Sequence, residues 1–352
     1  MPKRLNREEL LKQLEAVSAG LSSREIIEQS SCFAFIGKKV VTFNGDAACW
    51  CSCNLGITGA VQARPLLDVL RKMAEETIEI SSSESKLIIH GKQNRRARIA
   101  MESEITLPFK EIKEPKKWNT LPADFLEAVD MVHRCCGKDT DRLETFVHLH
   151  KEKVEAIGEY QVGHFRTRID LPENVIVHKD SVKHVVSLGM TEVGVTDKWV
   201  HFRNPTGLVL SCLKGAGEED YPSTEKALSI KGQRINLPRG LESAIERAAI
   251  FSRENPEDED VAVYLKPGKV IIVGTSASGD WREPKSLDYK GEPMDFLINP
   301  KLFQDICRRH HEAWVTQDVL KVKQGKFTFV TALGTKEDKK EETEAEESSS
   351  ED

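Results

Sequence analysis

The sequence lacks an apolar run close to the ~20 residues that span a bilayer. Its first residues, MPKRLNREELLKQL, give a charged amphipathic helical pattern without the apolar core of a signal peptide. It also lacks the common phosphate-binding and hydrolase motifs, G-x-x-x-x-G-K-[ST], G-x-G-x-x-G, G-x-S-x-G and H-E-x-x-H. Although 31% of its residues are charged, there is no basic excess, because the net charge is -6. We therefore expect a cytoplasmic protein with no membrane span and no cofactor, and not one that grips nucleic acid tightly through a basic surface.

Cysteine is too scarce for a disulfide scaffold, with eight in 352 residues. Cys49, Cys51 and Cys53 form a C-x-C-x-C group that would place three thiols on one face of a strand. No His or further Cys follows at metal-ligand spacing, so we favour simple strand packing and expect no metal. A thiol or zinc enzyme is the alternative, and stoichiometric zinc in the purified protein would reveal it.

The net negative charge comes from one segment. Residues 335–352 hold nine acidic residues and three lysines, which accounts for the whole charge of -6 and leaves the preceding body neutral. This segment is rich in Glu and Ser and has no aromatic residue, a composition typical of disorder. A solvating tail is the simpler interpretation, and a regulatory or charge-mimicking tail is the alternative.

An amphipathic helix is predicted at residues 239–255, where Leu241, Ala244, Ile245 and Ala248 share one face. Similar helices are predicted to start near residues 7, 63, 122, 179 and 299, so the pattern recurs about every 60 residues. Short alternating apolar runs separated by Gly-containing turns follow the helices, as expected of antiparallel strands. The sequence therefore predicts six copies of one unit, a helix followed by strands.

Two polar connectors, at residues 110–120 and 218–233, divide the six units into three pairs. We predict an α+β fold of three similar domains, at residues 1–118, 119–230 and 231–334, followed by an acidic tail at 335–352. Each domain would contain two helix-plus-antiparallel-strand repeats. Closing the open sheet edges into a ring would protect them from aggregation.

Several segments in this order carry a family resemblance: RPLLDVLRKMAEETIEI, GHFRTRIDLP, LESAIERAAIFSREN and INPKLFQDI. With these segments the chain resembles the bacterial-type β sliding clamp, the β subunit family of DNA polymerase III, from residue 5 to about 333. The resemblance implies a non-catalytic DNA clamp fold, in which a head-to-tail homodimer forms a ring around duplex DNA. Its implied partners are double-stranded DNA, held topologically and without sequence specificity, the replicative DNA polymerase, the clamp loader and other proteins with a clamp-binding motif.

The resemblance also implies a helical inner wall that faces DNA. The six predicted helices carry as many acidic as basic residues, which suits a ring that slides better than one that grips. The candidate DNA-facing residues are Arg24, Arg71, Lys72, Lys183, Arg247, Arg253, Lys301 and Arg308.

Two further sites follow from the resemblance. Ring closure would bring Ile99 and Met101 of one subunit against Ile250 and Phe251 of the other, with ordinary core packing as the alternative for these residues. A partner-peptide pocket would include Gly163, His164 and Phe165, with Phe329 or Val330 from the last strand. After Gly-His the family has Arg and an aliphatic residue, whereas this chain has Phe165 and Arg166.

A second function remains open at this stage. A clamp-shaped protein could sequester polymerase or loader partners without encircling DNA, and the neutral helices and acidic tail allow this. Retention on closed circular DNA, with loss after linearisation, would distinguish a true clamp from such a protein.

Overall fold

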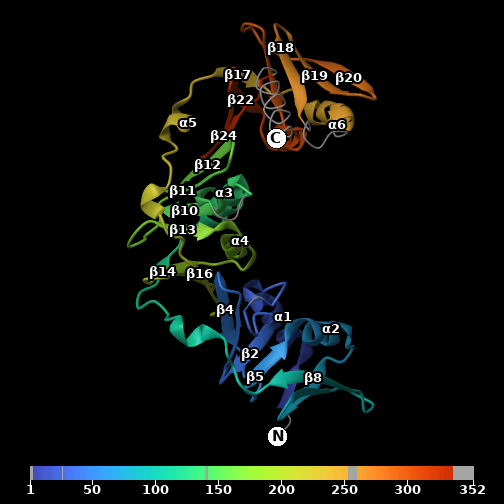
Figure 1. Ribbon diagram of the computed structural model, residues 1–352, viewed down its shortest axis with the longest axis vertical. Coiled ribbons are helices and arrows are strands. Elements are labelled where there is room, and N and C mark those ends of the chain that lie inside the picture. The colour runs from blue at the N-terminus through green and yellow to red at the C-terminus, as the bar shows by residue number, and fades with distance from the viewer. Residues whose placement is uncertain (1–2, 26, 139–141, 253–259, 336–352) are drawn as a thin grey trace, which may run out of the picture. The chain divides into compact units, whose positions relative to one another are not determined.

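The computed structural model describes residues 3–25, 27–138, 142–252 and 260–335 (Figure 1). They form two compact units. Unit 1 comprises the described residues of Met1–Ala156 and Arg166–Tyr221, and unit 2 those of Ile157–Phe165 and Pro222–Asp352. No helix in these four ranges is long and apolar enough to span a bilayer.

Six repeats of one unit, strand–helix–three strands, account for almost all of the regular structure. The six predicted helices are all present, which confirms the repeat. The sequence analysis missed the short strand that precedes each helix. The first three repeats are β1 (Lys3–Asn6), α1 (Arg7–Val17), β2 (Cys32–Ile36), β3 (Lys39–Phe43), β4 (Ala47–Ser52); β5 (Gly59–Gln62), α2 (Ala63–Lys72), β6 (Thr77–Ser83), β7 (Lys86–His90), β8 (Arg96–Glu102); and β9 (Asn119–Thr120), α3 (Phe125–Val132), β10 (Phe146–His150), β11 (Lys153–Ile157), β12 (Gln161–Arg166).

The other three repeats have the same order of elements, and a short helix, α5 (Glu225–Ser229), precedes the fifth. They are β13 (Val175–His178), α4 (Lys179–Ser187), β14 (Glu192–Val195), β15 (Trp199–Arg203), β16 (Val209–Leu213); β17 (Gln233–Asn236), α6 (Leu241–Ser252), β18 (Val261–Lys266), β19 (Lys269–Ser276), β20 (Gly279–Ser286); and β21 (Met294–Ile298), α7 (Pro300–Arg309), β22 (Glu312–Val315), β23 (Val319–Gln324), β24 (Phe327–Ala332).

Side-chain caps fix where several helices begin. The Asn6 side chain accepts a hydrogen bond from the Glu9 amide at 3.1 Å, so α1 starts at Arg7 and the preceding residues form β1. This corrects the expectation that the helix includes the first residues of the chain. Asn299 caps α7 in the same way, and Pro300 occupies the first helical position, where it sacrifices no hydrogen bond.

The short strands explain why the repeats come in pairs. The strand before each helix joins the sheet of the other repeat in its pair: β1 pairs with β6 and β5 with β2, β9 with β14 and β13 with β10, and β17 with β22 and β21 with β18. The two helices of a pair also pack together, as α1 with α2, α3 with α4 and α6 with α7 (Figure 1). A single repeat therefore cannot complete its sheet alone.

The first connector is a packed segment within unit 1, which holds the first four repeats except the end of β11 and most of β12. Leu107 and Ile112 are buried in a cluster with Trp50 of β4 and Trp199 of β15. Beyond them Pro115 lies so close to β14 that a Cβ at Gly194 would come within 2.5 Å of its ring. In addition, β4 and β16 pair as antiparallel strands. Apolar burial and backbone pairing thus join the first two pairs of repeats.

Candidate functional site

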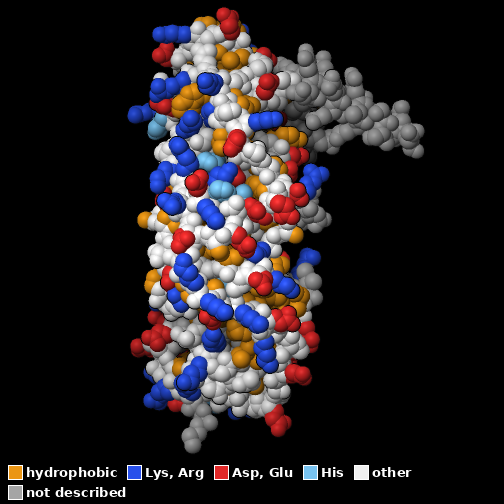
Figure 2. All heavy atoms as spheres, turned by 90° about the vertical axis from the view of Figure 1, so that its left-hand side faces the viewer, with side chains coloured by type: hydrophobic (Ala, Val, Ile, Leu, Met, Phe, Trp, Pro, Cys, Tyr) orange, Lys and Arg blue, Asp and Glu red, His pale blue; other side chains and the backbone are white. Residues whose placement is uncertain are grey.

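The candidate DNA-facing residues lie on exposed positions of the helices or beside them. Arg24 is exposed in the loop that follows η1 (Ser18–Gly20), Lys72 ends α2, and Lys301 lies in the first turn of α7. Arg253 lies outside the described residues. Figure 2 faces the left-hand side of Figure 1, where strands and α5 are labelled, and there blue and red side chains are interspersed.

Three of the other candidates are paired with nearby carboxylates. Arg71 contacts Glu15 of α1 at 2.9 Å, Lys183 contacts Asp180 at 2.8 Å, and Arg308 lies 3.8 Å from Asp305. The hydrogen bond from Lys183 lowers the pKa of the Asp180 carboxyl, so this pair stays charged at neutral pH. The helix surfaces are therefore locally neutralised, as their equal numbers of acids and bases suggested.

Arg71, Lys72 and Arg308 also occupy the last turns of their helices. A basic side chain at this end of a helix interacts favourably with the helix dipole and with carbonyl groups that have no partner within the helix. Their positions are explained in part by helix stability, independently of any nucleic acid.

Arg247 differs from the other candidates because its guanidinium binds a carboxylate on the sheet below. Its Nε and Nη2 atoms each donate to Glu283 of β20 at 2.8 Å. Glu283 also contacts Lys285 and accepts a hydrogen bond from the Trp281 indole. The Arg247 hydrogen bonds are the largest cause that holds the pKa of Glu283 at about 2. Arg247 thus joins α6 to β20, while its side chain stays 41% exposed, and that it faces DNA stays a prediction.

The partner-pocket candidates come together on two paired strands of unit 2. β12 and β24 are antiparallel, with Gly163 opposite Phe329 and Val162 opposite Val330. Directly opposite residues of such a pair point to the same side of the sheet, and successive residues alternate. Gly163, Phe165 and Phe329 therefore share one face, whereas His164 and Val330 lie on the other.

This arrangement corrects the predicted pocket. One surface site cannot use all five residues, because Phe165 and Phe329 point away from the side that presents His164. Phe165 and Phe329 are 3% and 6% exposed, as expected of core residues, whereas His164 is half-buried. Of the original set, only His164 and Val330 lie on the His164 face, and Val330 is itself only 4% exposed.

The ring-closure candidates also divide. Ile99 and Met101 on β8 are 6% and 7% exposed, so they pack inside their own unit. Their burial agrees with ordinary core packing, the alternative given above, and their part in ring closure stays a prediction. Ile250 on α6 is 63% exposed, and Phe251 is half-buried. Ile250 is the residue whose exposure suggests a missing partner.

The three clustered thiols are buried side chains on and just after β4. Cys49, Cys51 and Cys53 are at most 8% exposed. Burial raises the pKa of Cys51 to about 11 and that of Cys53 to about 12, so neither is a thiolate at neutral pH. Among the residues that the structure describes, no cluster of His, Cys, Asp and Glu could hold a metal.

Comparisons with known proteins were made by sequence and by structure. No protein-family model matches the chain, and no characterised protein sequence matches it. Several solved structures do match the chain. A putative DNA polymerase III β subunit from Eubacterium rectale is 17% identical, with a TM-score of 0.79 over 95% of this chain and 99% of that one. The DnaN sliding clamp of Pseudomonas aeruginosa bound to griselimycin is 14% identical with a TM-score of 0.81, and the β subunit from Thermotoga maritima has the same values, each over 95% of this chain and 99% of that one.

The chain has the sliding-clamp fold. The agreement covers nearly the whole chain, so the predicted α+β architecture of paired repeats is confirmed. At 14% to 17% identity the likeness describes the fold, and the roles of individual residues depend on the geometry above.

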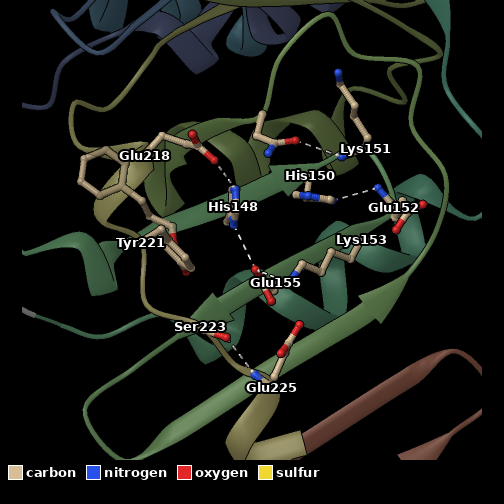
Figure 3. A network of polar contacts seen from close by, with 12 residues as sticks. His148, His150, Lys151, Glu152, Lys153, Glu155, Glu218, Tyr221, Ser223 and Glu225 are labelled. Carbon is tan, nitrogen blue, oxygen red and sulfur yellow. Dashed lines mark hydrogen bonds and ion pairs between the residues drawn. The ribbon is translucent and has the colours of Figure 1, made fainter.

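Within this clamp fold, sequence analysis missed a buried polar network in unit 1 (Figure 3). His148 of β10 lies between two carboxylates, with Nδ1 3.0 Å from Glu155 of β11 and Nε2 2.8 Å from Glu218. Lys153 contacts Glu155 at 2.9 Å, and the Tyr221 hydroxyl donates to the Phe146 carbonyl at 3.1 Å. The network fastens the segment after β16 to the sheet. The H-x-H and K-x-E spacings within two neighbouring strands were the available signal.

Proposed function

We propose that this chain is a sliding-clamp subunit, which encircles duplex DNA as a homodimeric ring and tethers the replicative DNA polymerase. The role is non-catalytic: the protein would hold DNA by enclosure. The support is the sixfold repeat together with the clamp fold over 95% of the chain.

The observation that carries the proposal is the pairing of the last strands of the repeats. Two pairs already exist, because β4 pairs with β16 and β12 pairs with β24. The two remaining last strands are β8 and β20. β20 ends its sheet, and the side of β8 away from β7 pairs with β5 only through Met101 and Glu102. A second copy arranged head to tail would bring β20 of each subunit to β8 of the other, so that the last strand of every repeat is paired with another last strand.

We propose the three-domain division predicted above: residues 1–118, 119–230 and 231–334, with the tail at 335–352. Each proposed domain contains one pair of repeats that exchange their first strands. Because the first connector is packed against β4 and β15, the first proposed domain and most of the second belong to unit 1, whereas residues 157–165 and 222–230 of the second belong to unit 2.

The partner site is proposed on the face of the β12–β24 pair that carries His164 and Val330. Its ligands would be short apolar peptides of the polymerase, the clamp loader and other proteins with clamp-binding motifs. Griselimycin is bound to the Pseudomonas aeruginosa and Bartonella birtlesii clamps, so it is the chosen probe. We expect saturable binding to this protein, weakened at least about tenfold by His164→Asp.

DNA loading decides between enclosure and other modes of binding. The purified protein is incubated with its loader and a nicked circular duplex, passed through a sizing column, and the DNA is then linearised. We expect the protein to remain with the circle at high salt, because enclosure does not depend on phosphate contacts, and to leave after linearisation. Retention on linear DNA, or loss from the circle, would overturn the proposal.

A clamp-like protein that sequesters partners without encircling DNA is the second candidate. The pairing of Arg71, Lys183, Arg247 and Arg308 with carboxylates favours it, because these helix cations are already partly neutralised. Binding of griselimycin without retention on closed circles would select this function.

A further inference from the structure

A buried lysine lies beneath the short helix α5 of unit 2. Lys321, in the middle of β23, is only 5% exposed. Its ammonium group donates to the Leu228 carbonyl at 3.2 Å and to the Ile230 carbonyl. Burial, and then the neighbouring Lys323, lowers the pKa of Lys321. A lysine is rarely placed at such a depth without a specific partner, and here the partners are the C-terminal carbonyl groups of a helix.

α5 has little else to hold it in place. It has five residues, too few for a helix that is stable by itself, and none of its side chains is fully buried. Lys321 supplies the kind of cation that the last carbonyl groups of a helix favour. The position of α5 therefore depends on hydrogen bonds to the Lys321 ammonium more than on an apolar core.

Strand register places this anchor beside the proposed partner site. Lys321 is opposite Val330 of β24, and Val330 is opposite Val162 of β12, so these three side chains lie on one face. The next row on that face consists of Lys323, Thr328 and His164. α5 also contacts β24 directly. The face that carries His164 is thus bordered by a helix that is fastened through Lys321.

We propose that Lys321 is a positioning residue of the partner site. Its ammonium group holds α5 in place as one wall of that site, so that Leu228 and Ile230 meet an apolar side chain of the bound peptide. The inference rests on the proposed function for the location of that site. Leu228 and Ile230 are half-buried, so each retains apolar surface that a ligand can cover. Release of α5 would remove this wall without altering the sheet that presents His164.

Hydrogen exchange and ligand binding test the inference on the full chain. Lys321→Met keeps an unbranched apolar side chain but removes the ammonium group. We expect amide exchange in residues 225–230 to become about tenfold faster, with β23 and β24 unchanged, and the Kd for griselimycin to rise about tenfold. Lys269→Met is the matched control, since Lys269 is an exposed strand lysine on the other sheet of unit 2, and both values should stay within about twofold of wild type.

Rescue distinguishes positioning from a general loss of structure. Lys321→Arg keeps a buried cation with several donors, so it should restore most of the exchange protection and affinity. Unchanged exchange in residues 225–230 of Lys321→Met would overturn the anchoring role. Wild-type affinity in that variant, with α5 released, would overturn its link to the partner site. If wild-type protein does not bind griselimycin while Lys321→Met still releases α5, the proposed partner site fails and the anchoring of α5 stands.

Discussion

Glu283 is a residue where one carboxylate supports two elements, because it binds Arg247 of α6 from β20. Its pKa is about 2 in the folded protein, against an ordinary value of 4.5. A depressed pKa means that the carboxylate form stabilises the fold above pH 4.5, and that this contribution is lost as the pH falls towards 2. We expect Glu283→Gln to lower the Tm by about 3 °C at pH 7, with the difference from wild type shrinking between pH 4.5 and pH 2.

Glu246→Gln is the control for this experiment, since Glu246 is exposed on the same helix. Its Tm should follow the wild-type curve across the pH range. If the Tm difference between Glu283→Gln and wild type stays constant from pH 7 to pH 2, the ionised pair does not have this role.

The His148 ring lies between the carboxylates of Glu155 and Glu218 and contacts both of them. Removing the imidazole leaves Glu155, which is 2% exposed, with one partner fewer. Loss of one member of a buried charged network typically costs about 3 kcal/mol, so His148→Leu should reduce the free energy of unfolding by that amount. Urea unfolding measures it, with His150→Leu as the control.

The half-buried His150 should matter less, because its ring accepts a hydrogen bond from the Glu152 backbone amide, whereas His148 joins two carboxylates. Equal losses for the two variants would show that the His148 bridge adds nothing specific. The sequence could place both histidines on one strand. It could not identify Glu218, which is 70 residues away from His148.

The same limit explains the prediction for Arg247. Helical periodicity puts Arg247 on the polar side of its helix, but its carboxylate partner comes 36 residues later, on a strand. When a cation and an anion meet only through tertiary structure, the local sequence around each of them does not indicate the pair. The predicted DNA-facing residues were therefore exposed as expected on most helices, while their ion pairs were not predictable.

At the scale of elements, α6 lies unusually close to β19. A Cβ at Gly274 of β19 would come within 1.9 Å of the Ala248 carbonyl oxygen of α6. Because this oxygen belongs to the backbone, no side-chain rotation relieves the clash. We expect Gly274→Ala to cost about 3 kcal/mol or more in the free energy of unfolding of unit 2, measured by urea unfolding.

Gly334→Ala is a matched control in the same unit, where the nearest heavy atom, Leu297 Cβ, would be 3.4 Å from the new Cβ. That change should be close to neutral. A Gly274→Ala variant as stable as Gly334→Ala would mean that α6 can move away from the sheet.

Helices were easier to predict than the strands that precede them. Each long helix has a continuous apolar stripe, whereas β9 has two residues, and β5 and β13 run directly into α2 and α4. A strand so short has no reliable alternation of its own. It is specified by its pairing with the sheet of the other repeat, which is non-local in the sequence.

At the scale of the whole molecule, the repeat itself contains the argument for assembly. Among the described residues there are 24 strands in six groups of four, and the last strands of four groups pair with one another within the chain. The same rule applied to the last two groups would pair them with those of a second copy. Repeat number and edge protection therefore support the proposed ring closure, while the part of Ile99 and Met101 of β8 in it stays a prediction.

Ile250 provides the test of that closure. It is 63% exposed at the end of α6, so replacing it with Asp removes little from the core of its own unit, whereas a buried unpaired charge at a subunit contact is costly. We expect wild type to sediment as a dimer and Ile250→Asp to raise the dimer dissociation constant at least about 100-fold, with an unchanged Tm for the monomer. Tyr160→Asp, at a side chain 62% exposed away from α6, should remain dimeric. A wild-type monomer at micromolar concentration, or an Ile250→Asp dimer as tight as wild type, would show that this end of α6 does not close the ring.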